Sequence, residues 1–205
     1  MKNTLKNFKL TTLGACLTLA LTTGALSTAV VAASHADEVR VAQAAKISLK
    51  QAIATASQQA SGTLVSAELD DNDGDAQSGN AVYELEFNTS TTSYEVKVDA
   101  MTGQIVTSET EQLDKGDISD YDIQQQAKIK MTDAIDIAEK QTKGQAIEIE
   151  FENDDDHANY QTYYEVKVFK DNQIFELKID AETGTVFKNS IEDIDAKPDM
   201  TAVEL

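Results

Sequence analysis

Six segments of the chain alternate hydrophobic and polar side chains with a period of two. This alternation predicts antiparallel strands that bury one face and expose the other. The apolar positions are, in chain order, Val65, Ala67, Leu69, Tyr83, Leu85, Phe87, Tyr94, Val96, Val98, Ile147, Ile149, Phe151, Tyr164, Val166, Val168, Phe175, Leu177 and Ile179. The positions between them carry mainly Glu and Lys. A shift of one residue would bury these charges, so the register of each strand is strongly specified.

Two other segments place apolar residues at helical spacing. Their stripes are Leu49, Ala52, Ile53, Ala56 and Ala60 in the first, and Met131, Ala134, Ile135 and Ala138 in the second. Ser48 is a good N-cap for the first helix, and Gly62 is expected to end it. Lys130 stands where a cap is expected for the second helix, so we expect capping there to shift to Thr132.

The chain is internally duplicated. Residues 83–106 align without a gap to residues 164–187, with 8 identities in 24 positions, where composition alone would give roughly one or two. Upstream, Lys46 and Gly62 correspond to Lys128 and Gly144, with a spacing longer by one residue. The sequence therefore predicts an α+β fold of two repeated units, each one helix packed on an antiparallel sheet of three to four strands.

Each unit contains the pattern Asp-Ala-x-Thr-Gly, at residues 99–103 and 180–184, followed by a short apolar pair. We expect a tight turn in which Gly103 and Gly184 have positive φ, leading into a final short strand. Asp99 and Asp180 are interpreted as turn formers that bond nearby backbone N–H groups, and not as ligands.

The order of helix, glycine, strand, acidic loop, Tyr-Glu-Val-Lys-Val strand and Asp-Ala-x-Thr-Gly turn resembles the PepSY domain family. The resemblance covers residues 46–109 and 128–193, with 110–127 as a linker and 194–205 as a C-terminal tail. It implies an exported or envelope protein and suggests a role in restraining peptidase activity. The family supplies no catalytic or ligand residue, and no His-Glu-x-x-His occurs in this sequence. Any inhibition is therefore expected to act on a separate enzyme.

The linker between the units is polar and acidic, and we expect at most a short helical extension around residues 124–126. Residues 37–45, before the first unit, are expected to be a terminus without assigned structure.

The N-terminus has the layout of a secretory signal peptide. Lys2, Lys6 and Lys9 precede an uncharged stretch, and Ser34-His35-Ala36 is a good cleavage tripeptide. We expect residues 1–36 to be removed, with an uncleaved membrane anchor as the alternative. The product would be periplasmic or extracellular, without membrane attachment, and would lack Cys16, the only cysteine.

The chain is strongly acidic, with a formal net charge of −19. Removal of three lysines with the signal peptide leaves 14 basic and 36 acidic residues, and 14 − 36 gives −22. This charge disfavours nucleic acid and anionic lipid as partners and favours basic partners or cations. A solvated acidic surface without a partner is the simpler interpretation.

Catalytic chemistry is not expected, and we assign no catalytic, cofactor-binding or metal-binding residue. His157 is the only histidine of the mature chain and lies in an acidic loop. The sequence has no Gly-x-Ser-x-Gly turn to hold a nucleophile beside it, as a serine hydrolase of that kind requires. We therefore interpret His157 as a surface residue, and we expect the protein not to be an enzyme.

Calcium is the weaker partner hypothesis. Asp71, Asp73 and Asp75 follow the first strand in a loop that resembles part of a calcium loop but lacks acids at its first and twelfth positions. The corresponding loop of the second unit contains Asp154, Asp155 and Asp156. Asp, Asn and Gly are also common in any exposed loop.

The expected function is therefore non-catalytic binding of another envelope or secreted protein, with a peptidase as one candidate, through sheet faces or edges. Glu and Lys on the strands could instead keep the edges from pairing. The alternative is an acidic protein that binds or buffers divalent cations such as calcium, and a sensing or scaffolding role is a third possibility.

Overall fold

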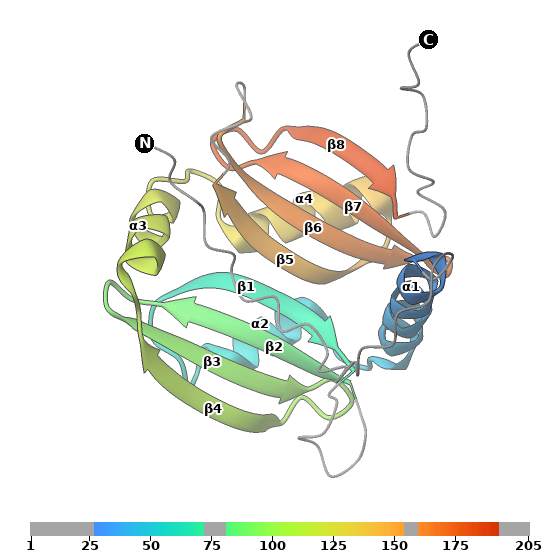
Figure 1. The fold of residues 1–205 in the computed structure, drawn as a ribbon, viewed down its shortest axis with the longest axis horizontal. Coiled ribbons are helices and arrows are strands. Elements are labelled where there is room, and N and C mark those ends of the chain that lie inside the picture. The colour runs from blue at the N-terminus through green and yellow to red at the C-terminus, as the bar shows by residue number, and fades with distance from the viewer. Residues whose placement is uncertain (1–26, 72–80, 154–159, 193–205) are drawn as a thin grey trace, which may run out of the picture.

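Eight strands form one continuous antiparallel sheet in the computed structural model, which describes residues 27–71, 81–153 and 160–192 (Figure 1). The elements are α1 (Ser27–Ala44), α2 (Leu49–Ala56), β1 (Thr63–Asp70), β2 (Val82–Asn88), β3 (Thr92–Asp99), β4 (Ile105–Gln112), α3 (Lys115–Gln124), α4 (Met131–Thr142), β5 (Gln145–Asn153), β6 (Thr162–Lys170), β7 (Gln173–Asp180) and β8 (Val186–Ile191). The predicted α+β fold of two units, each with one helix on three to four strands, is confirmed with four strands in each, and α1 and α3 are added to it.

The two units meet edge to edge. The strand order is β4-β3-β2-β1-β5-β6-β7-β8, so the first strands of the two units pair with each other at the centre. We call this β1–β5 pairing the seam. There Ser66 lies opposite Glu150, Ala67 opposite Ile149, and Glu68 opposite Glu148. Ala67 and Ile149 occupy equivalent positions in the two units and lie opposite each other. A pseudo-two-fold axis therefore passes through the seam and relates one unit to the other.

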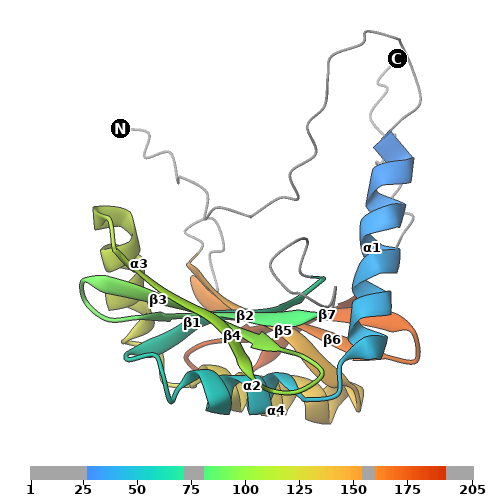
Figure 2. The ribbon, with the colours of Figure 1, turned by 90° about the horizontal axis from the view of Figure 1, so that it is seen from below.

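α2 and α4 cover one face of this sheet (Figure 2). Ser48 caps α2 through a capping box with Gln51, as predicted, because its Oγ accepts from the Gln51 N–H. The helix faces are buried as the stripes predict: Leu49, Ala52, Ile53 and Ala56 in α2, and Met131, Ala134, Ile135 and Ala138 in α4. Lys50 Nζ lies 2.6 Å from Asp136 Oδ1 and 2.8 Å from Glu139 Oε2, which links the two helices.

Two predicted helix boundaries are wrong. α2 ends at Ala56, six residues before Gly62, because the chain then makes a turn toward β1. Gly62 has φ 112° and lies against the backbone of Asn88. α4 begins at Met131 after Lys130, which makes no side-chain cap hydrogen bond, so Thr132 is not the cap. Lys143, with φ 64°, ends α4 in the left-handed conformation.

The Asp-Ala-x-Thr-Gly turns have the predicted geometry. Gly103 and Gly184 have φ of 72° and 73°. Asp99 Oδ1 accepts from the Thr102 N–H at 2.7 Å, and Asp180 Oδ1 accepts from the Thr183 N–H at 2.7 Å. The strand that follows each turn, β4 or β8, is longer than the predicted apolar pair. Both aspartates therefore act as turn formers.

One tyrosine in each unit ties the sheet to the segment before the helix. The hydroxyl of Tyr83 donates to Ile47 O at 2.9 Å, and that of Tyr164 donates to Ile129 O. Both rings are fully buried, and burial raises the pKa of each phenol to about 12. The two units therefore share this anchor as well as their strands.

We expect Tyr83→Phe to lower the free energy of unfolding by about 1–2 kcal/mol, because Ile47 O would lose its 2.9 Å donor and keep only the 3.5 Å contact from Gln145 Nε2. Tyr94→Phe, on the neighbouring strand, serves as the control and should change stability by less than about 0.5 kcal/mol. Urea denaturation of the two variants measures the difference. Equal effects would show that the hydroxyl of Tyr83 contributes no more than that of Tyr94.

The segment 110–127 contains the end of β4 and all of α3. Asp114 caps α3 through a capping box with Asp117. At the other end, the buried Gln124 Nε2 donates to Leu64 O at 2.8 Å. Leu64 lies at a bulge in β1, and the second unit has a bulge at the corresponding Ala146. The helical extension expected around residues 124–126 is thus displaced toward the N-terminus, because the capping box starts the helix at Lys115.

The segment before the first unit, for which no structure was predicted, belongs to α1. This helix rises from the end of the seam on the side of the sheet opposite α2 and α4 (Figure 2). Val41 and Ala42 are buried, and Gln43 Nε2 donates to Asn172 Oδ1 at 3.0 Å. α1 also includes Ala36, after which the sequence predicts cleavage.

Candidate protein-binding face

Within the described residues, no helix layer covers the sheet face opposite α2 and α4, although α1 and α3 stand at its margins (Figure 2). We call it the open face. Charged residues on this face include Glu68, Glu84, Glu86, Glu95, Lys97, Glu109, Glu111, Glu148, Glu150, Glu165, Lys167, Glu176, Lys178 and Lys188. Glutamates clearly outnumber lysines, as the period-two pattern predicted for the wet side of the sheet.

Several of these glutamates lie directly opposite one another on neighbouring strands. The like-charged pairs are Glu68 with Glu84, Glu68 with Glu148, Glu86 with Glu95, Glu95 with Glu109, and Glu150 with Glu165. Like charges at directly opposed positions destabilise a sheet. The sequence predicts that these glutamates lie on the outer face of the sheet. It does not predict that Glu68 lies opposite Glu148, because that contact depends on the pairing of β1 with β5.

The glutamates near the seam have raised pKa values. Burial, with Glu150 and Glu84 nearby, raises the pKa of Glu68 to about 7. Burial raises the pKa of Glu148 to about 8, although Lys167 acts in the opposite direction. Burial also raises the pKa values of Glu86 and Glu150. The centre of the open face therefore changes its charge at higher pH than ordinary glutamates would, with Glu68 and Glu148 titrating near pH 7 and pH 8.

Lysines on the open face offset part of this charge. Lys97 Nζ lies 2.7 Å from Glu84 Oε1, and Lys178 Nζ lies 2.8 Å from Glu165 Oε2. Each lysine is bound to a strand neighbour, as expected for cross-strand ion pairs of opposite sign.

Lys167 connects the seam to α1. Its Nζ lies 2.9 Å from Glu148 Oε2 and 3.3 Å from Glu38 Oε1 of α1. Burial by itself would lower the pKa of Lys167, but the carboxylates of Glu148 and Glu38 raise it above its ordinary value. Lys167 therefore stays charged and holds α1 against the open face.

Most of the candidate ligand residues lie outside the described residues. These are Asp73, Asp75, Asp154, Asp155, Asp156 and His157. Asp71 is described, and its Oδ2 lies 3.7 Å from Arg40 Nη2. Among the side chains that the structure describes, no group of three or more acidic, histidine or cysteine residues is arranged to hold a metal ion.

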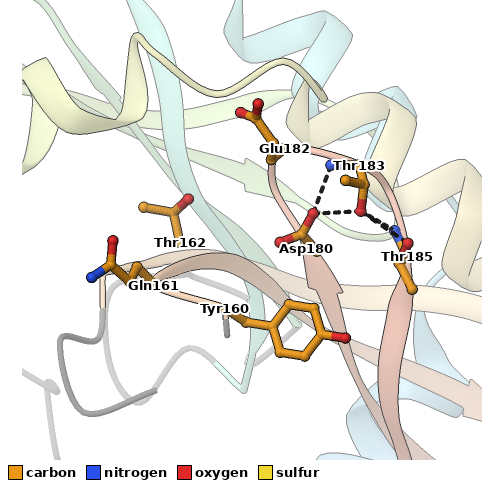
Figure 3. A pocket seen from close by; sticks show the side chains of 7 residues that line it. All are labelled: Tyr160, Gln161, Thr162, Asp180, Glu182, Thr183 and Thr185. Carbon is orange, nitrogen blue, oxygen red and sulfur yellow. Dashed lines mark hydrogen bonds between the residues drawn. The ribbon is translucent and has the colours of Figure 1, made fainter. Parts of the chain in front are cut away.

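A shallow depression of about 610 Å³ lies in the second unit, where the β7–β8 turn meets the start of β6 (Figure 3). Tyr160, Gln161 and Thr162 line one side. Asp180, Glu182, Thr183 and Thr185 line the other. A smaller hollow of about 160 Å³ lies among Glu86, Ser93, Glu95, Glu109, Thr110 and Glu111 in the first unit. Neither holds a nucleophile beside a histidine.

An aromatic cluster that was not predicted from the sequence lies beside the larger depression. Tyr160 stacks on Phe187 with ring centroids 4.0 Å apart and an interplanar angle of 3°. The ring of Tyr163 meets Phe187 edge-on at 5.5 Å. Alignment of the two units could have revealed this cluster, because the first unit has Val82 and Val106 where the second has Tyr163 and Phe187.

The sequence matches a family model described as the peptidase propeptide and YPEB domain, PepSY, at residues 46–109 and 128–189. Both matched stretches contain one helix on the covered side and the strands of one unit. The chain belongs to the PepSY family. It is a tandem PepSY protein whose two domains share one sheet.

Other comparisons add little to the PepSY assignment. No curated protein matches the chain. A crystal structure of a candidate lipoprotein from Clostridium difficile 630 is similar at 24% sequence identity and a TM-score of 0.42, covering 72% of this chain and 95% of that chain. Within the described part of the chain, no helix combines the length and apolar character needed to cross a membrane.

Proposed function

We propose that this tandem PepSY protein is exported and binds another exported protein, without catalysis, through the open face and the adjacent sheet edges. The observation that carries the proposal is the direct opposition of glutamates on neighbouring strands, as at Glu86 with Glu95 and Glu150 with Glu165. This arrangement lowers the stability of the sheet. A basic partner surface would remove the repulsion on binding, so the same residues would favour the complex.

The chemistry of the open face suits a basic protein surface better than a small ligand. The hollows are open and shallow, whereas small-molecule sites are usually enclosed and mostly apolar. An excess of carboxylates steers a basic partner and accelerates its association at low salt. The edge strands β4 and β8 offer backbone groups for pairing with an extended segment.

A peptidase is the partner class that we propose to test first, because PepSY domains are described from peptidase propeptides. The domain would act on a separate enzyme. An extended segment at an edge strand resembles the conformation in which peptidases bind substrates, which makes restraint of activity a physically reasonable outcome.

The first experiment uses the full-length chain, purified as an exporting host processes it and then immobilised. Basic proteins of the host's exported fraction should bind saturably, and binding should weaken by at least about tenfold between 50 and 500 mM salt. Glu86, Glu95 and Glu109 changed together to Gln should weaken capture by about tenfold. Retention of no exported protein at either salt concentration would refute the proposal.

The control variant changes Asp133, Asp136 and Asp171 together to Asn. It alters the net charge by the same amount on exposed sites away from the open face. Capture by this variant should match that of the unchanged protein. If both variants lose binding equally, net charge and not the open face determines the interaction.

The peptidase version has its own measurement. Added in trans, the chain should slow a thermolysin-like peptidase acting on a small chromogenic substrate, and it should remain intact during the assay. Rapid digestion of the chain without slowing would exclude this version while leaving other protein partners open to the capture experiment.

A further inference from the structure

The aromatic cluster beside the larger depression is a feature of the second PepSY domain alone. Tyr160 and Phe187 stack in parallel, and Tyr163 packs edge-on against Phe187. Lys178 Nζ lies 4.8 Å from the centroid of the Tyr163 ring. The cluster therefore joins the open face, where Lys178 lies, to the edge strand β8, which contains Phe187.

The duplication shows that the fold does not require these rings. Val82 and Val106 of the first domain align with Tyr163 and Phe187, and Gly79 aligns with Tyr160. The first domain still forms the same four strands in the same order and register. Tyr163 is buried, whereas Tyr160 and Phe187 are partly exposed, so these two rings remain accessible at the surface of the second domain.

The depression is chemically suited to a cation. Its lining contains the carboxylates of Asp180 and Glu182 together with hydroxyls of threonine, and no basic side chain. Asp180 is largely buried, at 8% exposed, and among the described residues both hydrogen bonds to its side chain engage Oδ1, which leaves Oδ2 as an acceptor. Glu182 also pairs with Lys128 on the helix side, so Asp180 is the main acceptor within the depression.

The ring of Tyr160 supplies the second element of a cation site. It is partly exposed and lines the depression, while Phe187 covers one of its faces. Figure 3 shows Asp180 across from the ring of Tyr160, which lies below it, with Glu182 and Thr183 above. A guanidinium group can stack on a tyrosine face and bond a carboxylate at the same time, which an ammonium group does less well.

We propose that this depression receives an arginine side chain from an extended segment of the partner protein, laid along the edge strand β8. The inference rests on the proposed function and names the contact by which the second domain contributes to it. β8 is the outermost strand on this side, so its outer backbone groups can pair with such a segment. The open shape of the depression fits one side chain of a bound chain better than an enclosed small molecule.

The test uses the full-length chain, purified as its host processes it and labelled with ¹⁵N. The probe is the peptide acetyl-Thr-Val-Arg-Val-Thr-amide, and the matched probe has norleucine in place of arginine. The arginine peptide should shift the amide signals of residues 160–162 and 183–187 saturably. The norleucine peptide should bind at least about tenfold more weakly, because it lacks the charge and the planar group.

Two variants separate the aromatic contribution from folding. Phe187→Val introduces the residue found at the same position of the first domain, so the fold should tolerate it. Tyr160→Leu keeps an apolar side chain but removes the ring face. Each should weaken the arginine peptide by about five- to tenfold. Met101→Ala, at the position of the first domain that corresponds to Glu182, should leave its affinity unchanged.

Equal binding of the two peptides, signal changes confined to the first domain, or no saturable binding up to 5 mM peptide would each overturn the proposal. The capture experiment distinguishes this failure from that of the proposed function. If the unchanged chain and Tyr160→Leu capture an exported protein equally, the arginine site is wrong and the binding function stands. If the peptide binds as expected and no exported protein is captured, the depression binds arginine but the proposed function is wrong.

Discussion

Gly62→Ala is expected to lower the free energy of unfolding by roughly 2–4 kcal/mol. A Cβ at Gly62 would lie 2.3 Å from the carbonyl oxygen of Asn88, which is backbone and cannot rotate away. The φ of 112° is also a conformation that L side chains rarely adopt. The substitution must therefore shift the turn before β1, which brings the first PepSY domain to the seam. Thermal unfolding followed by circular dichroism should show a fall in Tm of about 5–15 °C.

Gly103→Ala is the matched control for this prediction. Gly103 also has positive φ, at 72°, but a Cβ there would only touch the side chain of Ile47 at 3.6 Å. It should cost about 1–2 kcal/mol from backbone conformation alone. If the two variants lose the same stability, the close approach of Gly62 to Asn88 does not contribute.

Glu68→Gln is expected to stabilise the protein at alkaline pH and to have little effect near pH 4. Burial raises the pKa of Glu68 to about 7 from its ordinary value of 4.5. The folded protein therefore keeps a proton that the unfolded chain has lost. Stability falls as pH rises from about 4.5 to about 7, and the full penalty persists above that range. The difference of 2.5 pH units, from 7 − 4.5, sets a ceiling of about 3 kcal/mol.

The measurement is urea unfolding of the unchanged chain and of Glu68→Gln at pH 4 and pH 8.5. At pH 8.5 the variant should gain roughly 1–3 kcal/mol in the free energy of unfolding. Glu111→Gln, an exposed change on the same face, should alter stability by less than about 0.5 kcal/mol at either pH. A gain for Glu68→Gln that is the same at both pH values would contradict a titration of this group.

Much of the fold follows from local patterns in the sequence. The period-two alternation assigned the core face of both halves of the sheet, because each strand has one apolar side and a shift would bury charge. Val65 is the exception, because a bulge in β1 gives its predicted place in the core to Leu64. The Asp-Ala-x-Thr-Gly turns were also predictable, because everything the turn requires lies within five consecutive residues. The aspartate accepts a backbone N–H of the turn, and the glycine adopts the positive φ. These features depend only on neighbours along the chain.

The features that were not predicted depend on distant residues. α3 has no apolar stripe, and it is held by its own capping box and by Gln124, which bonds the bulged strand at Leu64. The burial of Val41 depends on packing against strands that follow much later. The contact of Glu68 with Glu148 exists only because β1 pairs with β5. Alignment of the two domains could have revealed the aromatic cluster, as Val106 against Phe187 shows.

The pseudo-two-fold seam suggests how such a protein could arise. Residue 66 pairs with 150, and its equivalent 148 pairs with 68, so the contact is that of an isologous dimer. A single-domain ancestor could have built the same sheet from two separate copies. Fusion would turn that association into an intramolecular event that no longer depends on protein concentration. Fusion would also allow the two domains to diverge in sequence. A binding site such as that beside the aromatic cluster could then evolve in the second domain alone.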